Sequence, residues 1–362
     1  MDAMTTSALA LADPEYQARV GAALDAAWER ARPGPAFDLA ADRWIIFSDQ
    51  HKGARNGADD FLRGERAYNA ALAYYHQLGY TLVALGDVEE LWEETPAAVV
   101  RAYPYTLELE ARFQQAGRYL RVWGNHDDDW ARPELVRRYL GPFFGAELAV
   151  AEGLRVSVRA AGAEIGTLFL AHGHQGDPAS DAWSSLSRLA VRYFWRPFQR
   201  LTHLSVNTPA TDWQLRERHN IALYTWAQRQ STRVLIAGHT HRPVFRAQTH
   251  AEQVQRLLAD LEARHAAAPD DRRLAELMAK VAAELEWVRA QDFRAPGPEG
   301  APQPMSTPCY FNTGCCCFAD GDVTGLELAG GEIRLVRWPD RHGRPRPQVL
   351  ASAALPDVFA AC

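Results

Sequence analysis

The stretch Trp44-Ile-Ile-Phe-Ser-Asp-Gln-His51 decides the fold prediction, because an apolar run leads directly into residues that can bind a metal. A short apolar run of this kind predicts a strand that is buried on both faces. The pattern returns before four more polar motifs: Gly86-Asp87, Gly124-Asn-His-Asp127, Ala171-His-Gly-His174 and Gly238-His-Thr-His241. Helical segments predicted at residues 59–79 and 97–116 separate the first three runs, as crossovers between parallel strands require. The sequence therefore predicts an α/β protein.

The five motifs are expected to meet at one rim, because ligands of open α/β sheets bind beyond the carboxyl ends of the strands. Around Val156, and again from Tyr310 to Trp338, strand-turn-strand patterns occur without intervening helices. These patterns predict a second sheet that packs on the first. A further helix is predicted from about Pro14 to Ala31, before a Pro-Gly-Pro sequence.

Composition limits the partners and the compartment. The 362 residues carry a formal net charge of −6, so the chain has no general attraction to nucleic acid and no stable complex with it is expected. An anionic substrate would need a local attraction such as bound cations. Five cysteines, crowded toward the C-terminus, do not form a disulfide framework and indicate a reducing, cytoplasmic location. No segment has the apolar length of a spanning helix, while peripheral membrane contact stays open.

The polar motifs supply mixed oxygen and nitrogen ligands. Residues two apart in an extended chain point to the same side, and both Asp-x-His and His-x-His have this spacing. The candidate metal ligands are Asp49, His51, Asp87, Asn125, His172, His239 and His241. Seven ligands are too many for one tetrahedral ion but suit two ions about 3.5–4 Å apart that share a bridge. We expect Asp87 to bridge two divalent transition-metal ions and a hydroxide between them to attack the substrate.

His126 lies next to the candidate ligand Asn125 and is predicted to act on the substrate. It would stabilise the developing charge or protonate the leaving oxygen, with Asp127 orienting its ring. A single histidine at a strand end is more often structural than a ligand. Five such strand ends in one chain favour a shared catalytic site.

With these motifs in this order, residues 43 to about 245 and the strand after Tyr310 resemble the calcineurin-like metallophosphoesterases. The resemblance implies a four-layer α/β/β/α sandwich with helical insertions and a dinuclear centre. One ion would be held by Asp49, His51, Asp87 and His241, and the other by Asp87, Asn125, His172 and His239. His126 matches the catalytic histidine of the family, and His174 is left as a substrate contact or a support for the ligands.

Among members, the chain is similar to the UDP-2,3-diacylglucosamine hydrolases in the Gly86-Asp-Val-Glu-Glu-Leu-Trp92 run, in His172-Gly-His-Gln-x-Asp177 and in Gly238-His-Thr-His-Arg-Pro243. It departs from them at His126, where those enzymes carry arginine. The resemblance implies a phosphorylated small molecule or a lipid-linked nucleotide as substrate. Manganese is the expected metal, and iron, zinc and cobalt suit the same ligands.

Two segments fall outside the repeated pattern. Residues 177–230 form an aromatic and basic insertion, read either as a lid whose Arg192 and Arg196 meet phosphate or as a helix with solvated arginines. Residues 250–295 predict a helical hairpin, for which an arm or a homodimer contact is preferred. The predicted domains are therefore a helical extension at 1–40, a core at 41–245 and 305–350, and these two insertions.

The run Cys315-Cys-Cys317 is predicted to contribute small buried residues. Successive side chains of a strand point to opposite faces, so three neighbours cannot chelate one ion well.

The main hypothesis for function is hydrolysis of phosphoester or pyrophosphate bonds. The alternatives are a non-catalytic scaffold on the same fold, or a nuclease or phosphodiesterase.

Overall fold

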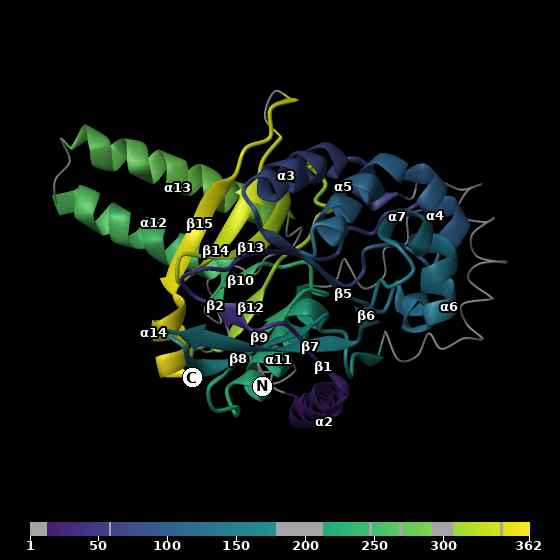
Figure 1. Ribbon diagram of the computed structural model, residues 1–362. Coiled ribbons are helices and arrows are strands. Elements are labelled where there is room, and N and C mark those ends of the chain that lie inside the picture. Colours follow the sequence, from purple (N-terminus) through teal and green to yellow (C-terminus); the bar gives the residue numbers. More distant parts are fainter. Residues whose placement is uncertain are drawn as a thin grey trace.

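The computed structural model describes residues 13–57, 59–178, 213–245, 248–267, 271–291, 307–340 and 343–362. Two mixed β-sheets form its centre, with helices on their outer faces (Figure 1). The predicted α/β class is confirmed. Arg192 and Arg196, with most of the predicted 177–230 insertion, lie outside the described residues.

The first sheet has seven strands in the order β15-β14-β13-β3-β4-β5-β6. Strands β3 to β6 run parallel, and β13 pairs antiparallel with β3 through Leu326 and Ile46. The strands are β3 (Arg43–Phe47), β4 (Thr81–Leu85), β5 (Tyr119–Val122), β6 (Val150–Ala151), β13 (Val323–Ala329), β14 (Glu332–Trp338) and β15 (Gln348–Ala354).

The second sheet has eight strands in the order β1-β7-β8-β9-β12-β10-β11, with β2 also paired to β7. Strands β8, β9 and β12 run parallel to one another at its centre. The strands are β1 (Arg32–Pro33), β2 (Phe37–Asp38), β7 (Gly153–Ala160), β8 (Ala163–Ala171), β9 (Arg233–Ala237), β10 (Val244–Phe245), β11 (Gln248–Thr249) and β12 (Tyr310–Asn312).

The predicted division between the sheets was wrong in one respect. The hairpin of β13 and β14 extends the first sheet, because β13 pairs with β3 instead of starting a separate layer. The motifs after β8 and β9 belong to the second sheet. The five motifs therefore come from the strand ends of two sheets, and not from one rim.

Alternating side chains explain why the strand sequences are apolar throughout. Ile45 and Phe47 face a core shared with helices α3 (Glu65–Gln77) and α5 (Pro104–Gln115), whereas Trp44 and Ile46 face a core shared with the second sheet. In β8, Leu168 and Leu170 join the core between the sheets, and the alternate residues join a third core with helices α2 (Pro14–Arg30) and α11 (Trp213–Ala227). Both faces of each central strand are thus covered.

Helices cover the outer faces and connect the strands. The helix α2 (Pro14–Arg30) packs against α11 (Trp213–Ala227) on the second sheet. The others are η1 (Asp60–Leu62), α3 (Glu65–Gln77), α4 (Pro96–Ala102), α5 (Pro104–Gln115), η2 (Asp128–Ala131), α6 (Pro133–Leu135), η3 (Val136–Leu140), α7 (Gly141–Phe144) and α14 (Leu355–Ala361). No helix in the described ranges is both long and apolar enough to cross a membrane.

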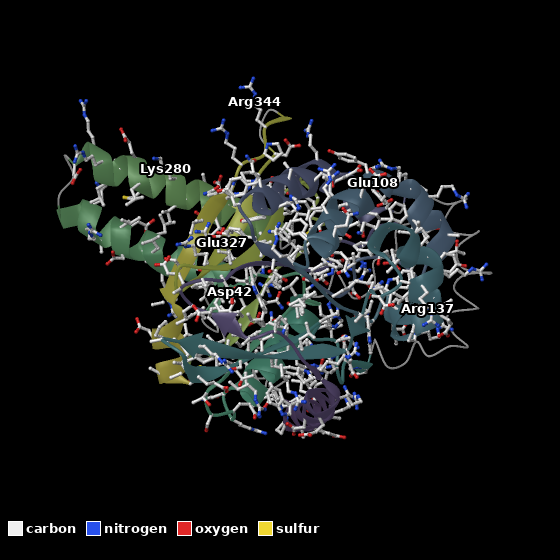
Figure 2. All side chains as sticks on the ribbon, viewed as in Figure 1. Asp42, Glu108, Arg137, Lys280, Glu327 and Arg344 are labelled. Atoms are coloured by element: carbon white, nitrogen blue, oxygen red, sulfur yellow. The ribbon has the colours of Figure 1, made fainter. Side chains whose placement is uncertain are left out.

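The predicted hairpin at 250–295 is present as α12 (His250–Ala267) and α13 (Arg272–Gln291). It projects from the body of the molecule, and Figure 2 labels Lys280 on this arm. Val254, Leu261, Leu274, Val281 and Leu285 give the hairpin an apolar core of its own. In the sequence, the hairpin follows β11 and precedes β12. In space, it lies on the side of β15 away from α7 (Figure 1).

Candidate metal centre

The polar residues that follow the strands have an unusual backbone conformation. Left-handed φ values occur at Asp49 (53°), His51 (50°), Asp87 (52°), His239 (67°) and His241 (56°). Within the described ranges, these are five of eight residues other than glycine with positive φ. Non-glycine residues adopt this region at a cost, and such strain concentrates at functional sites. The loops therefore hold these five side chains in positions that a relaxed backbone would not give.

The first donor cluster contains Asp49, His51 and His241. Nε2 of His241 lies 3.2 Å from Oδ1 of Asp49, and Nε2 of His51 lies 3.9 Å from the same oxygen. The two Nε2 atoms are only 3.1 Å apart. The outer nitrogen of each ring, Nδ1, points away from the other ring. When Nδ1 carries the proton, the lone pairs of the two Nε2 atoms face each other. A cation between them would relieve that repulsion.

The second donor cluster contains Asp87, His172 and His239. Nε2 of His172 is buried 3.0 Å from Oδ2 of Asp87 and makes no hydrogen bond of normal geometry with a described residue. The side-chain oxygen of Asn125 is also buried without a hydrogen-bond partner in the described chain. Buried polar atoms are nearly always paired, so these unpaired donors fit a bound cation.

The outer nitrogen, directed away from the donor cluster, is held by an oxygen acceptor in three of the four histidines. Nδ1 of His172 lies 2.9 Å from the carbonyl of Leu85, and Nε2 of His239 lies 3.0 Å from Oδ2 of Asp177. Nδ1 of His51 lies 3.0 Å from Oε2 of Glu90. Metal-binding histidines are oriented in this way, because the outer hydrogen bond fixes the tautomer. His241 differs, since Sγ of Cys317 lies 3.7 Å from its Nδ1.

Asp87 lies between the two clusters. Its Oδ2 atom is 3.0 Å from Nε2 of His172 and 3.8 Å from Nε2 of His51. Its Oδ1 atom accepts the backbone N–H of His126 at 2.8 Å, which brings the loop of Asn125 against the second cluster. This position is the one that a carboxylate shared by two cations would need.

The electrostatics of the centre favour positive charge. Burial alone would raise the pKa of Asp49, but His172 and His241 hold it well below its usual range. Burial would lower the pKa of His172, whereas Asp87 and Asp49 raise it to about 9. The carboxylates that attract these protons would attract a metal cation equally. The residues present therefore fit a pair of divalent ions.

Comparison with protein-family models and with curated proteins gives no match. Among solved structures, the chain is similar to Vacuolar Protein Sorting 29 from Cryptosporidium parvum, with 11% identity and a TM-score of 0.32 over 86% of this chain and 98% of that one. It is also similar to a dimetal phosphatase from Danio rerio, with 12% identity and a TM-score of 0.36 over 86% of this chain and 100% of that one. At this level of similarity, we infer function from the side-chain geometry alone.

His126 is held beside the first cluster by two residues. Its Nδ1 atom lies 2.7 Å from Oε2 of Glu90, and its ring stacks on Trp92 with centroids 3.9 Å apart. Burial would raise the pKa of Glu90, but the neighbouring His126 and His51 lower it to about 2. An ionised carboxylate therefore faces Nδ1 of the His126 ring.

Asp127 does not orient His126, contrary to the prediction. Its carboxylate accepts backbone N–H groups from Gly124 at 2.6 Å, Val88 at 3.0 Å and Asp87 at 3.2 Å. The Asp127 side chain therefore connects the loop after β4 to the loop after β5. Glu90 carries the orienting role that sequence reasoning assigned to Asp127.

A fully buried ionic network supports these loops. Arg121 pairs with Glu89 and lies 3.7 Å from Asp127, and Lys52 bonds Glu110 at 2.8 Å. Lys52 also lies 3.4 Å from Glu89. All of these side chains are shielded from solvent. The network links the residue after His51 to the strand before Asn125, and so fixes the two loops relative to each other.

His174 lies beside the second cluster without joining it. Its ring centroid is 5.6 Å from that of His172 and 5.5 Å from that of Trp123. Burial, with the neighbouring His172 and His239, holds the pKa of His174 well below its usual range. A neutral imidazole in this place fits the predicted role next to the ligands.

The predicted burial of the cysteine run is confirmed for Cys315 and Cys316, whereas Cys317 is half-buried. The run lies in a loop after β12, and only Cys316 joins the apolar core. Cys315 and Cys317 lie with His241 in a group whose donor atoms are all within 4.8 Å of one another. The prediction did not consider two of the cysteines together with a residue from another loop.

Three residues that contact the histidines of the site were not predicted to do so from the sequence. Glu90 follows Asp87 by three positions, and Asp177 follows His174 by three. The third is Cys317. Spacing from a predicted ligand was the signal available for the first two, although the direction of their side chains depends on loop geometry.

Proposed function

We propose that the chain is a metal-dependent hydrolase of phosphoester or diphosphate bonds, with the α/β/β/α architecture of the calcineurin-like metallophosphoesterases. One observation carries the proposal. Three histidines from three strand-end loops each have an outer nitrogen held by an acceptor, while their rings and that of His241 converge on Asp49 and Asp87. A structural histidine cluster has no need for this orientation.

Two sets of residues would hold the ions. Asp49, His51 and His241 with Asp87 would form one site, and Asp87, Asn125, His172 and His239 the other. When bound, two divalent ions supply charge neutralisation for phosphoryl oxygens and an acidified water. Manganese is our first choice, and iron, zinc and cobalt suit the same donors.

The chain's own residues would manage the leaving group. Glu90 fixes the His126 ring and stabilises positive charge on it, so Nε2 can donate a proton to the leaving oxygen. Trp92 stacks on one face of the ring and limits its rotation. His174 would contact substrate as a neutral donor near the second cluster. A lipid-linked nucleotide diphosphate is the finer substrate proposal, and it rests on the sequence motifs alone.

The experiment measures metal content and turnover separately. Protein freed of metal by chelation would be reloaded with Mn²⁺, Fe²⁺, Zn²⁺ or Co²⁺, analysed by mass spectrometry for bound metal, and assayed with chromogenic phosphate mono- and diesters. We expect about two ions for each chain and turnover with at least one metal. Failure of every metal to bind would disprove the proposal. Binding without turnover of any ester would favour a scaffold.

Three variants sharpen the assignment. Asp87→Ala should lose both metal and turnover, because its carboxylate lies between the clusters. His126→Ala should keep both ions and lose turnover by roughly 10²- to 10⁴-fold, the usual contribution of an acid–base group. His76→Gln on α3, where the ring packs on Phe113, is the matched control and should change neither quantity. Loss of metal in His126→Ala would assign that residue to the ligands instead.

A further inference from the structure

A second kind of donor group adjoins the acidic centre. Cys315, Cys317 and His241 place one sulfur or nitrogen atom each within 4.8 Å of the others. Sγ of Cys317 lies 3.7 Å from Nδ1 of His241. Cys316 points elsewhere, because its Sγ lies 3.9 Å from the carbonyl of Thr324 within the apolar core. Only two of the three thiols therefore lie beside His241.

The spacing fits a tetrahedral soft-metal site. With a zinc–sulfur bond of about 2.3 Å and a zinc–nitrogen bond of about 2.0 Å, a tetrahedral edge is roughly 3.6 Å. The observed separation of Cys317 Sγ from His241 Nδ1 is 3.7 Å, so both atoms could bind one ion with little movement. Two thiols and an imidazole prefer zinc and other soft ions over magnesium, calcium or manganese.

The cluster shares His241 with the first donor set but uses the other side of its ring. His241 directs Nε2 to Asp49 at 3.2 Å and Nδ1 to Cys317, so the two sides of one ring face different donors. Cys315 is almost fully buried, whereas Cys317 and His241 are half-buried. The site is therefore buried on the side of Cys315 and partly exposed on the side of Cys317 and His241.

We propose that Cys315, Cys317 and His241 form a thiolate site for a thiophilic divalent cation, Zn²⁺ above all, linked to the acidic centre through the His241 ring. Binding of one cation releases the two thiol protons. Where Nε2 of His241 already holds an ion, binding at Nδ1 also releases the ring proton. The proposal depends on this three-residue geometry and not on hydrolase activity.

The test uses Cd²⁺ as an optical substitute for Zn²⁺. Full-length protein, freed of metal and kept reduced, would be titrated with Cd²⁺ while the ultraviolet absorption of cadmium–thiolate bonds is recorded. We expect this absorption to rise to a plateau, because carboxylate and imidazole ligands give no thiolate band. Absence of the band in the wild-type protein would overturn the proposal.

Variants locate the sulfur ligands. Cys315→Ser and Cys317→Ser should each lose roughly half of the band or more, since one of two thiolates is removed. Cys362→Ser is the matched control, because the side chain of Cys362 contacts Cys309 and lies outside this cluster. It should keep the full band. A band that disappears in Cys362→Ser and persists in the other two would assign the cation to the Cys309–Cys362 pair and overturn the proposal.

A measurement on the wild-type protein covers the case in which a variant fails to fold. Iodoacetamide should alkylate Cys317 in the metal-free protein, and Cd²⁺ should suppress that alkylation while leaving Cys362 reactive, as peptide masses would show. Equal alkylation of Cys317 with and without Cd²⁺ would contradict the proposal. Neither readout involves phosphoester turnover, so failure of the hydrolase and failure of the thiolate site are distinguishable.

Discussion

Glu90 lies 2.7 Å from Nδ1 of His126 and 3.0 Å from Nδ1 of His51, so one carboxylate orients two histidines of the site. One of these rings belongs to the first donor cluster and the other faces substrate in our proposal. Glu90 therefore positions both His126 and His51, which is a proposed metal ligand.

Glu90→Gln should lower kcat roughly 10- to 100-fold, the usual effect of losing an outer support of a metal site, with a smaller change in KM. Glu93→Gln, three residues along the same turn, is the control. An unchanged kcat in Glu90→Gln would show that the contact is only structural.

Gly124→Ala should weaken metal binding. A Cβ at Gly124 would overlap Oδ1 of Asp87 and the ring of His172, two donors of the second cluster. We expect at least a 10-fold loss in metal affinity, measured by competition with a chelator. Gly57→Ala is the matched control, because no atom of the described ranges lies within 4 Å of its added Cβ. Equal affinity in the two variants would place the cations away from Asp87 and His172.

Arg121→Met should destabilise the fold by about 3–5 kcal/mol, because it leaves Glu89 buried with a weakened set of partners. Arg132→Met is the surface comparison, since its side chain is 56% exposed and its pair with Asp129 should contribute about 1 kcal/mol or less. Urea unfolding of both variants gives the two free energies. A small effect in Arg121→Met would mean that Lys52 alone neutralises Glu89.

His219 predicts a pH dependence of stability. Burial, with the charge of His239 nearby, lowers its pKa to about 4, while the unfolded chain has the ordinary value near 6.5. The unfolded state therefore binds the proton first, and the stabilisation present above pH ~6.5 is lost as the pH falls toward ~4. The loss amounts to about 3 kcal/mol.

Denaturant unfolding at several pH values would check this, with His219→Gln as the comparison. The variant cannot titrate at this position, so its stability should fall less than that of the wild-type protein over the same window. Both proteins should be free of metal, because His219 packs 5.2 Å from the ring of His239. Parallel pH curves for the two proteins would contradict the assigned cause.

Much of the fold was predictable because strand ends and ligand motifs coincide in this sequence. Apolar runs such as Thr81–Leu85 predicted the central strands, and alternation of side chains explains why they are apolar on both faces. The division into sheets was not predictable, because the pairing of β13 with β3 joins segments nearly 300 residues apart, as Leu326 and Ile46 show. Period and composition carry no information about such pairings.

The candidate site was also predictable only in part. The strand-end residues predicted as donors meet in the structure, because each follows a strand directly and has little freedom of position. The supports were not predicted, since the left-handed backbone at His51 and Asp87 turns the next residues in directions that spacing does not give. Glu90 therefore holds the His126 ring, the role that was predicted for Asp127.

The origin of the donors from two sheets has a consequence for how the molecule is made. Asp49, Asp87 and Asn125 follow strands of one sheet, and His172, His239 and His241 follow strands of the other. Neither sheet by itself carries the full donor set of either proposed ion. In our proposal, metal retention would therefore report that the two sheets have docked.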